Sequence, residues 1–374
     1  MQRLPESWDE EQLFTTGDDY FAGLLAAIER AQTSIELETY IFEKGVLADR
    51  LVEKLLAAVK RGVRVRLIVD GWGSPGFAID YWPQLKEGKV KVHFFRVIPW
   101  ILRRFPGDPE SLPRRILTRL RSVNRGLHRK FCIVDGKELW VGSFNVSDVH
   151  LKEALGEQAW KDIGVCVRGR ELKHAHRAFQ RAYRGWAAPN WPTQSPRLLL
   201  LNDSFLHQRR TRLEHIQRLK KATKRIWVST PYFVPIGQVY RLLAKKAKQG
   251  LDVRVIVPRQ NDVWLMKWVS WPLLKGLADK GVRVFVYEPR FSHQKVFIAD
   301  NWICIGSTNF NHRSFLHDLE MDVVITREEN RQRVIKDFHH DQDLSTPFDL
   351  SAWSRLSLWE RLFCMVFNLL KYWS

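Results

Sequence analysis

Two stretches of the chain carry the same pattern: LHRKFCIVDGKELWVGSFN, residues 127–145, and SHQKVFIADNWICIGSTNF, residues 292–310. Each contains H-x-K and then an aspartate five residues after the lysine. Each continues to G-S-x-N, after six intervening residues in the first copy and five in the second. A single H-x-K occurs by chance in many proteins, whereas two complete patterns at matching places indicate an internal duplication.

The sequence around the two patterns repeats as well. Residues 26–70 and 215–258 each read as the end of a helix, a β-rich run, an amphipathic helix that ends at a glycine, and another β-rich run. A third strand is expected at Val90–Phe95 and at Val282–Tyr287. Strands that alternate with helices at this spacing predict an α/β fold with mostly parallel sheets, covered by helices on both faces.

The boundary between the two copies is expected in the Pro- and Trp-containing stretch GWAAPNWPTQSPR, Gly185 to Arg197. We therefore predict a first lobe over residues 1–190 and a second over 191–352. Residues 353–374 are predicted to form a separate amphipathic segment that associates with a membrane.

The spacing within each pattern has a chemical meaning. Side chains two apart on a strand point to one face, so the pattern aims an imidazole and an ammonium at one place, and the residue between them faces away. In G-S-x-N, the glycine allows a close backbone approach, and the hydroxyl and amide are neutral donors near an anion. One imidazole could attack phosphorus while the other protonates the leaving oxygen, without a metal or another cofactor.

These residues are the candidates for a phosphodiester site. The candidate catalytic residues are His128, Lys130, Asp135, Asn145, His293, Lys295, Asp300 and Asn309, and the candidate phosphate-binding residues are Ser143 and Ser307.

At these residues the chain resembles the phospholipase D superfamily, whose members carry the HxKxxxxD motif twice. The resemblance implies a duplicated phospholipase D-like fold, with two α/β/α lobes and one shared active site. It also implies that His128 is the nucleophile, forming a phosphohistidine, and that His293 is the general acid; the opposite assignment stays open. The resemblance further implies an acidic catalytic residue after each G-S-x-N, for which Glu320 is the candidate in the second copy and Asp162 its nearest counterpart in the first.

The composition indicates an anionic partner. Sixty Lys and Arg against 41 Asp and Glu give a net charge of +19, which fits nucleic acid or acidic lipid, and the sixteen tryptophans favour a membrane interface. The amino end shows neither the basic nor the apolar region of a secretory signal, which predicts a cytoplasmic protein. The four cysteines are too widely spaced for a zinc site and are expected to be buried thiols.

Within the superfamily, the chain is most similar to bacterial cardiolipin synthases without amino-terminal transmembrane helices. The residues that carry this similarity are GSTNFNHRSFLHDLE, Gly306 to Glu320, and the aromatic, basic carboxyl end. Three further features fit a lipid substrate, although a solvated basic loop or ordinary core packing would also explain them. They are the basic and apolar stretch from Trp100 to Lys130, the tryptophans Trp264, Trp268 and Trp271 at helical spacing, and the tail from Trp353 to Ser374.

Together these features predict a cardiolipin synthase-like phosphatidyl transferase that passes a phosphatidyl group to a lipid alcohol such as phosphatidylglycerol and releases glycerol. The expected partners are anionic phospholipids and a membrane surface, at the cytoplasmic face of the bacterial inner membrane, and not nucleic acid. One alternative is a phospholipase D or nuclease-type phosphodiesterase in which water is the acceptor. The other is a catalytically inactive protein that binds anionic lipid or nucleic acid. The oligomeric state stays open.

Overall fold

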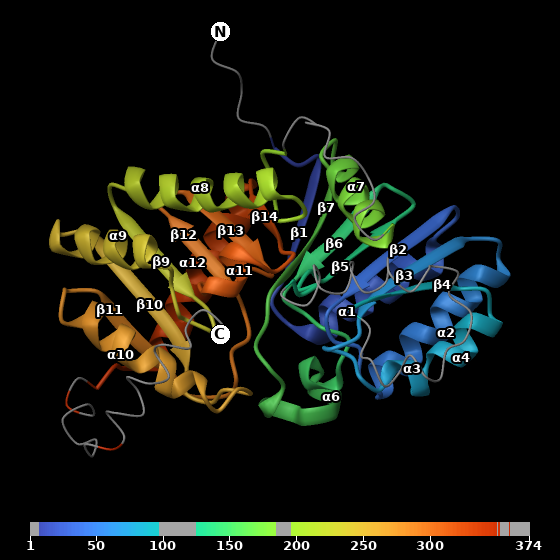
Figure 1. Cartoon of the computed structure of the whole chain (residues 1–374), viewed down its shortest axis with the longest axis horizontal. Coiled ribbons are helices and arrows are strands. Elements are labelled where there is room, and N and C mark those ends of the chain that lie inside the picture. Colours follow the sequence, from blue (N-terminus) through green and yellow to red (C-terminus); the bar gives the residue numbers. More distant parts are fainter. Residues whose placement is uncertain (1–6, 97–124, 185–195, 350, 352–358, 360–374) are drawn as a thin grey trace, which may run out of the picture.

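Each half of the chain builds one sheet between layers of helices (Figure 1). The structure is a computed structural model that describes residues 7–96, 125–184, 196–349, 351 and 359. The strands of the first lobe are β1 (Glu10–Phe14), β2 (Ser34–Thr39), β3 (Arg64–Asp70), β4 (Lys91–Phe95), β5 (Phe131–Val134), β6 (Glu138–Gly142) and β7 (Gly164–Arg168). Its α-helices are α1 (Gly17–Arg30), α2 (Val46–Lys60), α3 (Phe77–Asp80), α4 (Trp82–Glu87), α6 (Lys152–Leu155) and α7 (Leu172–Tyr183), and its 3₁₀ turns are η2 (Asp148–His150) and η3 (Gly156–Gln158).

The second lobe repeats this order. Its strands are β8 (Leu199–Leu201), β9 (Arg225–Ser229), β10 (Asp252–Pro258), β11 (Arg283–Tyr287), β12 (Val296–Ala299), β13 (Trp302–Gly306), β14 (Met321–Ile325) and β15 (Ser345–Pro347). Its helices are α8 (Phe205–Lys221), α9 (Gly237–Lys248), α10 (Met266–Ala278), α11 (His312–Leu316) and α12 (Glu328–Asp343).

The strand orders confirm the duplication. The first sheet runs β1-β7-β6-β5-β2-β3-β4 and the second β15-β11-β10-β9-β12-β13-β14-β8. Strands β2 to β7 therefore correspond one by one to β9 to β14. The central strand after each motif, β5 or β12, lies beside the first parallel strand of its lobe, β2 or β9.

The expectation of mostly parallel sheets is wrong. Within the described residues, β2, β3 and β4 are parallel, as are β9, β10 and β11, whereas the other strand pairs are antiparallel. The turn at the motif aspartate accounts for one antiparallel pair in each lobe, β5 with β6 and β12 with β13. Asp135 and Asp300 adopt left-handed φ values of 52° and 53°, and a turn this short can join only antiparallel neighbours.

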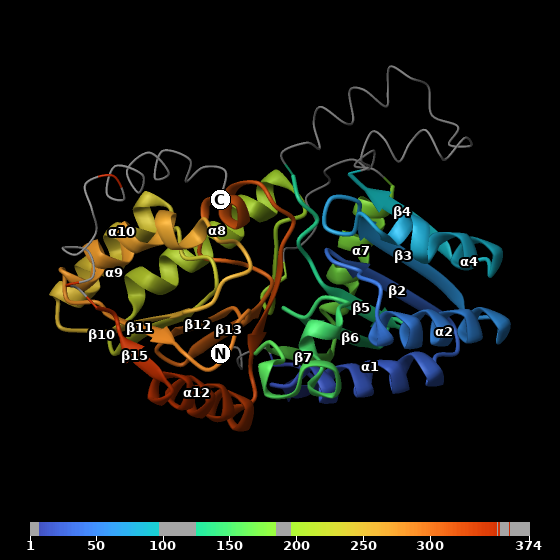
Figure 2. The same cartoon turned by 90° about the horizontal axis from the view of Figure 1, so that it is seen from below.

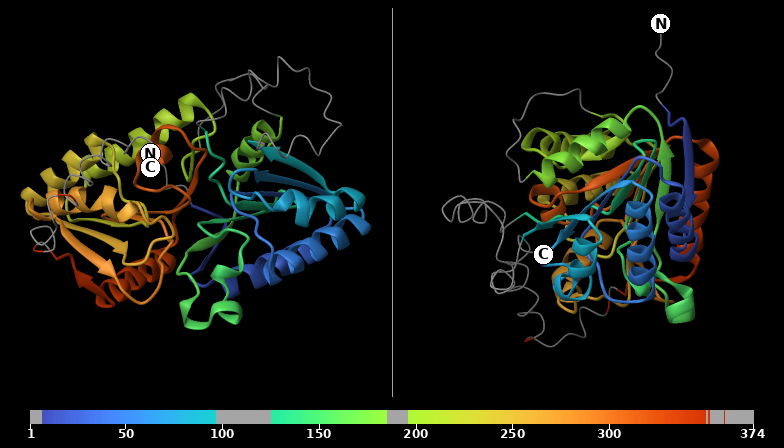
Figure 3. Two further views of the ribbon diagram at one scale, coloured as in Figure 1. Left: turned by 60° about the horizontal axis from the view of Figure 1, so that its bottom comes forward. Right: turned by 90° about the vertical axis from the view of Figure 1, so that its right-hand side faces the viewer.

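Helices cover both faces of each sheet, as expected. In the first lobe α1 and α2 lie on one face and α7 on the other; in the second, α8, α9 and α10 lie opposite α12 (Figures 2 and 3). The corresponding helices α1 and α8 also begin alike. The hydroxyls of Thr16 and Ser204 accept the backbone N–H groups of Asp19 and His207, which fixes the first turn of each helix.

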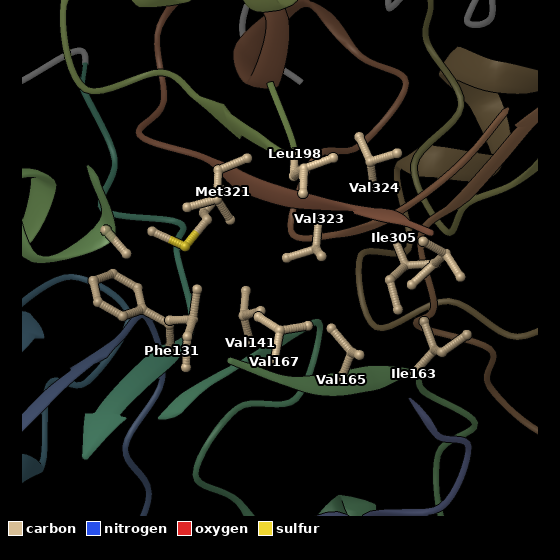
Figure 4. Close-up of a cluster of buried hydrophobic side chains, with 14 of the residues drawn as sticks. Phe131, Val141, Ile163, Val165, Val167, Leu198, Ile305, Met321, Val323 and Val324 are labelled. Atoms are coloured by element: carbon tan, nitrogen blue, oxygen red, sulfur yellow. The ribbon is translucent and has the colours of Figure 1, made fainter. Parts of the chain in front are cut away.

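An apolar seam joins the two lobes (Figure 4). Val141 and Val165 from β6 and β7 of the first lobe belong to one buried cluster with Ile305, Met321 and Val323 from β13 and β14 of the second. The lobes are thus fused through the antiparallel halves of their sheets, and the strands that follow the two motifs lie near this seam.

Polar contacts extend the seam along its edge. The indole Nε1 of Trp8 donates to the carbonyl of Val324 at 3.0 Å, and the Asn330 amide of α12 donates to the carbonyl of Glu11 in β1 at 3.0 Å. The Arg333 guanidinium donates to the carbonyl of Leu13 at 3.2 Å. Side chains of the second lobe therefore occupy carbonyls along the free edge of β1.

Several expectations lie partly outside the described residues: the linker, most of the basic stretch before the first motif, and most of the tail from Trp353. Among the cysteines, Cys132 and Cys304 are buried free thiols, as expected, and Cys166 is half-buried. The expected helical face of three tryptophans is corrected for Trp264, which precedes α10; Trp268 and Trp271 lie within the helix at i and i+3, and Trp271 packs against Phe348. Across the described ranges, no helix has both the length and the apolarity needed to span a bilayer.

Candidate active site

Each motif histidine is positioned by a backbone contact with the other lobe. Leu127 forms a parallel bridge with Leu319, and the N–H of His128 donates to the Leu319 carbonyl at 3.0 Å. The second half mirrors this arrangement: the N–H of His293 donates to the Lys161 carbonyl at 2.8 Å. The residue that follows each of these carbonyls is the acidic residue of that lobe, so the chain crosses the seam to place each imidazole beside a carboxylate.

Both histidines bind that carboxylate through Nδ1. His128 Nδ1 lies 3.0 Å and 3.1 Å from the two oxygens of Glu320, and His293 Nδ1 lies 2.8 Å from Asp162 Oδ2. A proton held on Nδ1 leaves Nε2 free as the reactive nitrogen. Glu320 and Asp162, the acidic residues expected after each G-S-x-N, thus each lie beside the motif histidine of the opposite lobe, and their catalytic role stays a prediction.

The motif serines hold these carboxylates in place. The Ser307 and Ser314 hydroxyls each donate to Glu320 at 2.5 Å, and the Ser143 hydroxyl donates to Asp162. Ser143 and Ser307 have no exposed surface. The expectation that these two serines bind phosphate is therefore revised: their hydroxyls orient the carboxylates that orient the histidines.

The two carboxylates differ in their pKa values. Burial raises the pKa of Glu320 to about 8, although the nearby Lys130 acts in the opposite direction. Burial would also raise the pKa of Asp162, but His293 and its hydrogen bond bring that pKa below the usual range. Burial also lowers the pKa of His293, to about 4. The two halves of the site therefore have the same arrangement of residues, but the pKa of the carboxylate is raised in one half and lowered in the other.

Two buried lysines meet in the site. Lys130 Nζ donates to the carbonyl of His128 at 2.7 Å, and Lys295 Nζ to that of His293 at 2.5 Å. Burial lowers the pKa of Lys130 to about 7, with a further contribution from Lys295, and burial lowers the pKa of Lys295 to about 8. In the described part of the chain, neither ammonium is within ion-pair distance of a carboxylate. Two such cations from opposite lobes form a site for an anion.

The motif asparagines complete the set. Asn145 Oδ1 accepts the backbone N–H of Ile41 at 3.2 Å, and Asn309 Oδ1 accepts the Thr230 hydroxyl at 3.3 Å. Both side chains are buried. Because their oxygens are used as acceptors, the amide NH₂ groups are the donors that remain for an anion.

The motif aspartates are not part of this constellation. Asp135 accepts the backbone N–H groups of residues 32–34, and Asp300 those of residues 223–225, at 2.7–3.0 Å. Burial acts to raise their pKa values, but these N–H groups lower them overall. Each aspartate thus ties the motif hairpin to the start of the neighbouring strand, so the assignment of Asp135 and Asp300 as catalytic is corrected to a structural role.

A third histidine, His150, was missed from the sequence. Its Nε2 accepts the N–H of Asn145 at 3.1 Å, and its Nδ1 lies 3.4 Å from Asp162 Oδ2. The second lobe has Ser314 at the corresponding place, five residues after Asn309, where its hydroxyl accepts the Asn309 N–H at 3.1 Å. Aligning the residues after each asparagine would have found His150, although the different residue type hides the match.

A metal could be held elsewhere in the described residues. His215, Cys304 and Asp322 offer ligand atoms that lie within 4.8 Å of one another, and all three are buried in the second lobe. None of the motif histidines belongs to this group.

Comparison with known proteins agrees with the site. The family described as "Cardiolipin synthase, PLD-like domain" matches residues 24–182 and 215–342. The cardiolipin synthase of Alkalihalophilus pseudofirmus is 28% identical over 367 residues, covering 94% of this chain and 70% of that protein. Cardiolipin synthase A of Pseudomonas putida is 27% identical over 358 residues, covering 90% and 70%.

Solved structures show the same fold at low identity. A phosphatidylserine synthase of Haemophilus influenzae superposes with a TM-score of 0.70 at 13% identity, covering 99% of this chain and 96% of that one. A polyphosphate kinase of Porphyromonas gingivalis gives a TM-score of 0.58 at 13% identity, covering 88% of this chain and 50% of that one. Since the family match spans both copies of the motif, and the copies meet in one site, the chain belongs to the phospholipase D-like family of cardiolipin synthase domains.

Proposed function

We propose that the protein is a cardiolipin synthase-like phosphatidyl transferase that works through a phosphohistidine intermediate. One observation carries the proposal: two imidazoles, each held by a carboxylate of the opposite lobe, meet beside two buried lysines that lack a carboxylate within ion-pair distance in the described residues. This set supplies a nucleophile, an acid and a cationic pocket for one phosphate.

In the first half of the reaction, His128 Nε2 attacks the phosphorus of the donor lipid. The bond from phosphorus to the departing glycerol oxygen breaks, and His293 gives its Nε2 proton to that oxygen. Glu320 stabilises the imidazolium character that develops on His128. Lys130 and Lys295 stabilise the negative charge that grows on the non-bridging oxygens.

In the second half, the hydroxyl of an acceptor lipid takes the place of glycerol. His293 removes the proton of this hydroxyl while its oxygen attacks the phosphorus, and the bond from phosphorus to His128 breaks. The products are the transferred phosphatidyl ester and the enzyme in its starting protonation state. Exclusion of water at this stage separates transfer from hydrolysis.

The difference in pKa between the two carboxylates supports this division of roles. An ionised Asp162 acts to raise the pKa of its partner His293, against the larger lowering effect of burial, and so favours the protonated form that the acid step requires. Glu320, whose pKa burial raises, places less negative charge beside His128. A neutral imidazole is the form that can attack phosphorus.

The identity of the substrate rests on several supports. The relatives compared above are named cardiolipin synthases, and the net charge of +19 attracts acidic lipids. We therefore propose anionic phospholipids as substrates and a peripheral position at the cytoplasmic face of the bacterial inner membrane. Fractionation of cells with and without a high-salt wash tests that position.

Product analysis tests the reaction. The protein is incubated with phosphatidylglycerol vesicles and the lipids are separated. Cardiolipin together with free glycerol supports transfer, whereas phosphatidic acid would assign hydrolysis. DNA cleavage with no lipid conversion would contradict a lipid substrate.

Trapping the intermediate tests the residue roles. In His293→Ala both half-reactions lose their acid–base group, so the donor used is a phosphatidyl ester of p-nitrophenol, whose leaving group needs no protonation. Phosphatidyl-histidine should then accumulate at His128 and be found by mass spectrometry of an alkaline digest. In His128→Ala no adduct should form. An adduct on His293 in the second variant would reverse the assignment.

A further inference from the structure

Two corresponding segments expose large apolar side chains, one from the loop and helix α3 after β3 and the other from the loop after β10. After β3, Trp72 is 58% exposed and Ile79 is 63% exposed; after β10, Val263 is 42% and Trp264 is 68% exposed. Strands β3 and β10 are counterparts, each the middle strand of the three parallel ones in its lobe. The four residues, here called the apolar rim, thus come from equivalent places in the two lobes.

In the first lobe, a short chain of contacts links the apolar rim to the active site. The N–H of Trp72 donates to Asp70 at 2.9 Å, and the Arg96 guanidinium lies 5.7 Å from the centre of the Trp72 ring. Arg96 also binds both oxygens of Asp70, at 2.8 and 2.9 Å. Asp70 in turn accepts the N–H of Leu127, the residue before His128, at 3.0 Å.

The second lobe has a matching connection. The Tyr232 hydroxyl donates to Asp262, the residue before Val263, at 2.6 and 2.7 Å. The Tyr232 ring lies 6.4 Å from the ring of His293. Trp72 and Val263 are thus connected to the neighbourhood of His128 and His293, through Asp70 in the first lobe and through Asp262 and Tyr232 in the second.

An exposed tryptophan is energetically unfavourable in water. Its indole has an apolar body and a polar N–H, so its free energy falls when it enters the boundary between an apolar phase and water. Exposed apolar side chains that are connected to a functional site in this way mark an interaction surface. Arg96 beside Trp72 is only 8% exposed and is paired with Asp70, so the attraction to an anionic headgroup layer comes from the net charge of +19.

The position of the apolar rim decides what covers it. A protein partner that contacted both lobes here would obstruct the approach to the histidines. A bilayer that contacts both lobes delivers a lipid substrate to them. We propose that Trp72, Ile79, Val263 and Trp264 dock onto an anionic bilayer, so that the site takes its phosphatidyl donor directly from the membrane. This inference rests on the proposed function, since it assumes a lipid substrate.

The test compares a double variant with a matched control. Trp72→Ala combined with Trp264→Ala removes the two indoles, and Phe205→Ala removes an equally exposed ring, 67% exposed, at the start of α8. In Figure 1, α8 lies along the edge opposite α3 and α10. Partition onto phosphatidylglycerol vesicles is measured by sedimentation. Turnover is measured on vesicles and on a short-chain phosphatidylglycerol below its micelle concentration.

The double variant should bind vesicles at least about tenfold more weakly and turn over vesicle lipid correspondingly less. Its turnover of the monomeric short-chain lipid should stay within about twofold of the parent, since no rim residue touches the reacting atoms. Phe205→Ala should match the parent in all three measurements. Equal vesicle binding by the double variant and the parent, or equal losses in the double variant and the control, would overturn the proposal.

A local probe separates the apolar rim from any other membrane contact of the chain. A polarity-sensitive fluorophore is attached at Trp264→Cys and, separately, at Phe205→Cys, with labelled parent protein as background. Vesicles should shift the emission to the blue at position 264 and not at 205; no shift at 264 would overturn the proposal. If the parent protein converts neither lipid while the shift at 264 occurs, the proposed function fails and the docking surface stands.

Discussion

The environment of Glu320 makes Glu320→Gln a sharp test of the site. The carboxylate accepts hydrogen bonds from Ser307 and Ser314 at 2.5 Å each, and His128 Nδ1 lies 3.0 and 3.1 Å from its two oxygens. A glutamine offers one oxygen and one NH₂ group, so at least one of these donors must face another donor. The imidazole then loses the partner that holds its proton on Nδ1, and Nε2 becomes the protonated, unreactive nitrogen.

The magnitude follows from the same geometry. The equivalent amide substitution in a Ser-His-Asp triad lowers kcat by about 10⁴-fold. At about 1.36 kcal/mol for each factor of ten, this corresponds to about 5.5 kcal/mol of lost transition-state stabilisation. We expect a similar loss of kcat in Glu320→Gln, with KM for phosphatidylglycerol changed by less than about threefold, because the lysines that we propose to bind the phosphate are intact.

Steady-state kinetics on phosphatidylglycerol vesicles measure this loss, and thermal unfolding checks that the variant is folded. Glu288→Gln, which alters a surface ion pair with Arg259, is the matched control and should keep its kcat. A loss smaller than tenfold in Glu320→Gln would refute the reasoning. It would mean that the side chain acts in its protonated form, for which glutamine is a close mimic; burial already raises its pKa to about 8.

Three further outcomes follow from the structure. Asp135→Ala should lower the free energy of unfolding by about 1–3 kcal/mol in urea titrations, with kcat unchanged. Because the pKa of Asp135 is lowered in the folded protein, this difference should be present above about pH 4 and shrink as the pH falls further. A large loss of kcat would contradict the structural role. Arg129→Met leaves Glu38 as a buried, unpaired carboxylate and should cost about 3–5 kcal/mol in the same assay, whereas a loss below about 1 kcal/mol would contradict the buried ion pair. Sulfate, which stays a dianion, should bind more weakly as the pH rises through about 7 and 8, where Lys130 and Lys295 lose their protons; calorimetry that finds one affinity from pH 6 to 9 would rule this out.

The sequence predicted the paired imidazoles because their pattern is local. His128 and Lys130 are two residues apart in extended backbone, and both contact the ring of Tyr40, at 5.2 and 5.3 Å, while Arg129 between them points away to Glu38. Strand alternation is enough to predict this arrangement. The duplicated order of elements likewise predicted two equivalent lobes.

Other features depended on contacts between distant residues. The hairpin after each motif adds an antiparallel pair to each sheet, and further antiparallel pairs flank it; the regular alternation of helices and strands did not reveal them. Asp135 looked catalytic because it belongs to the motif, but its partners at residues 32–34 are about a hundred positions away. His150 was hidden because one lobe uses an imidazole where the other uses the hydroxyl of Ser314.

The seam between the lobes constrains how the enzyme handles its substrates. The two lobes pack against each other along β6, β7, β13 and β14, and Trp8 and Asn330 form hydrogen bonds at the margin of this interface. Closure of the lobes about a hinge would have to break this apolar interface. The distance between the two imidazoles is therefore fixed once the protein has folded. In the proposed reaction, closure of the lobes therefore cannot shield the phosphohistidine from water, and the proposed docking of the protein on a membrane would decide between lipid and water as acceptor.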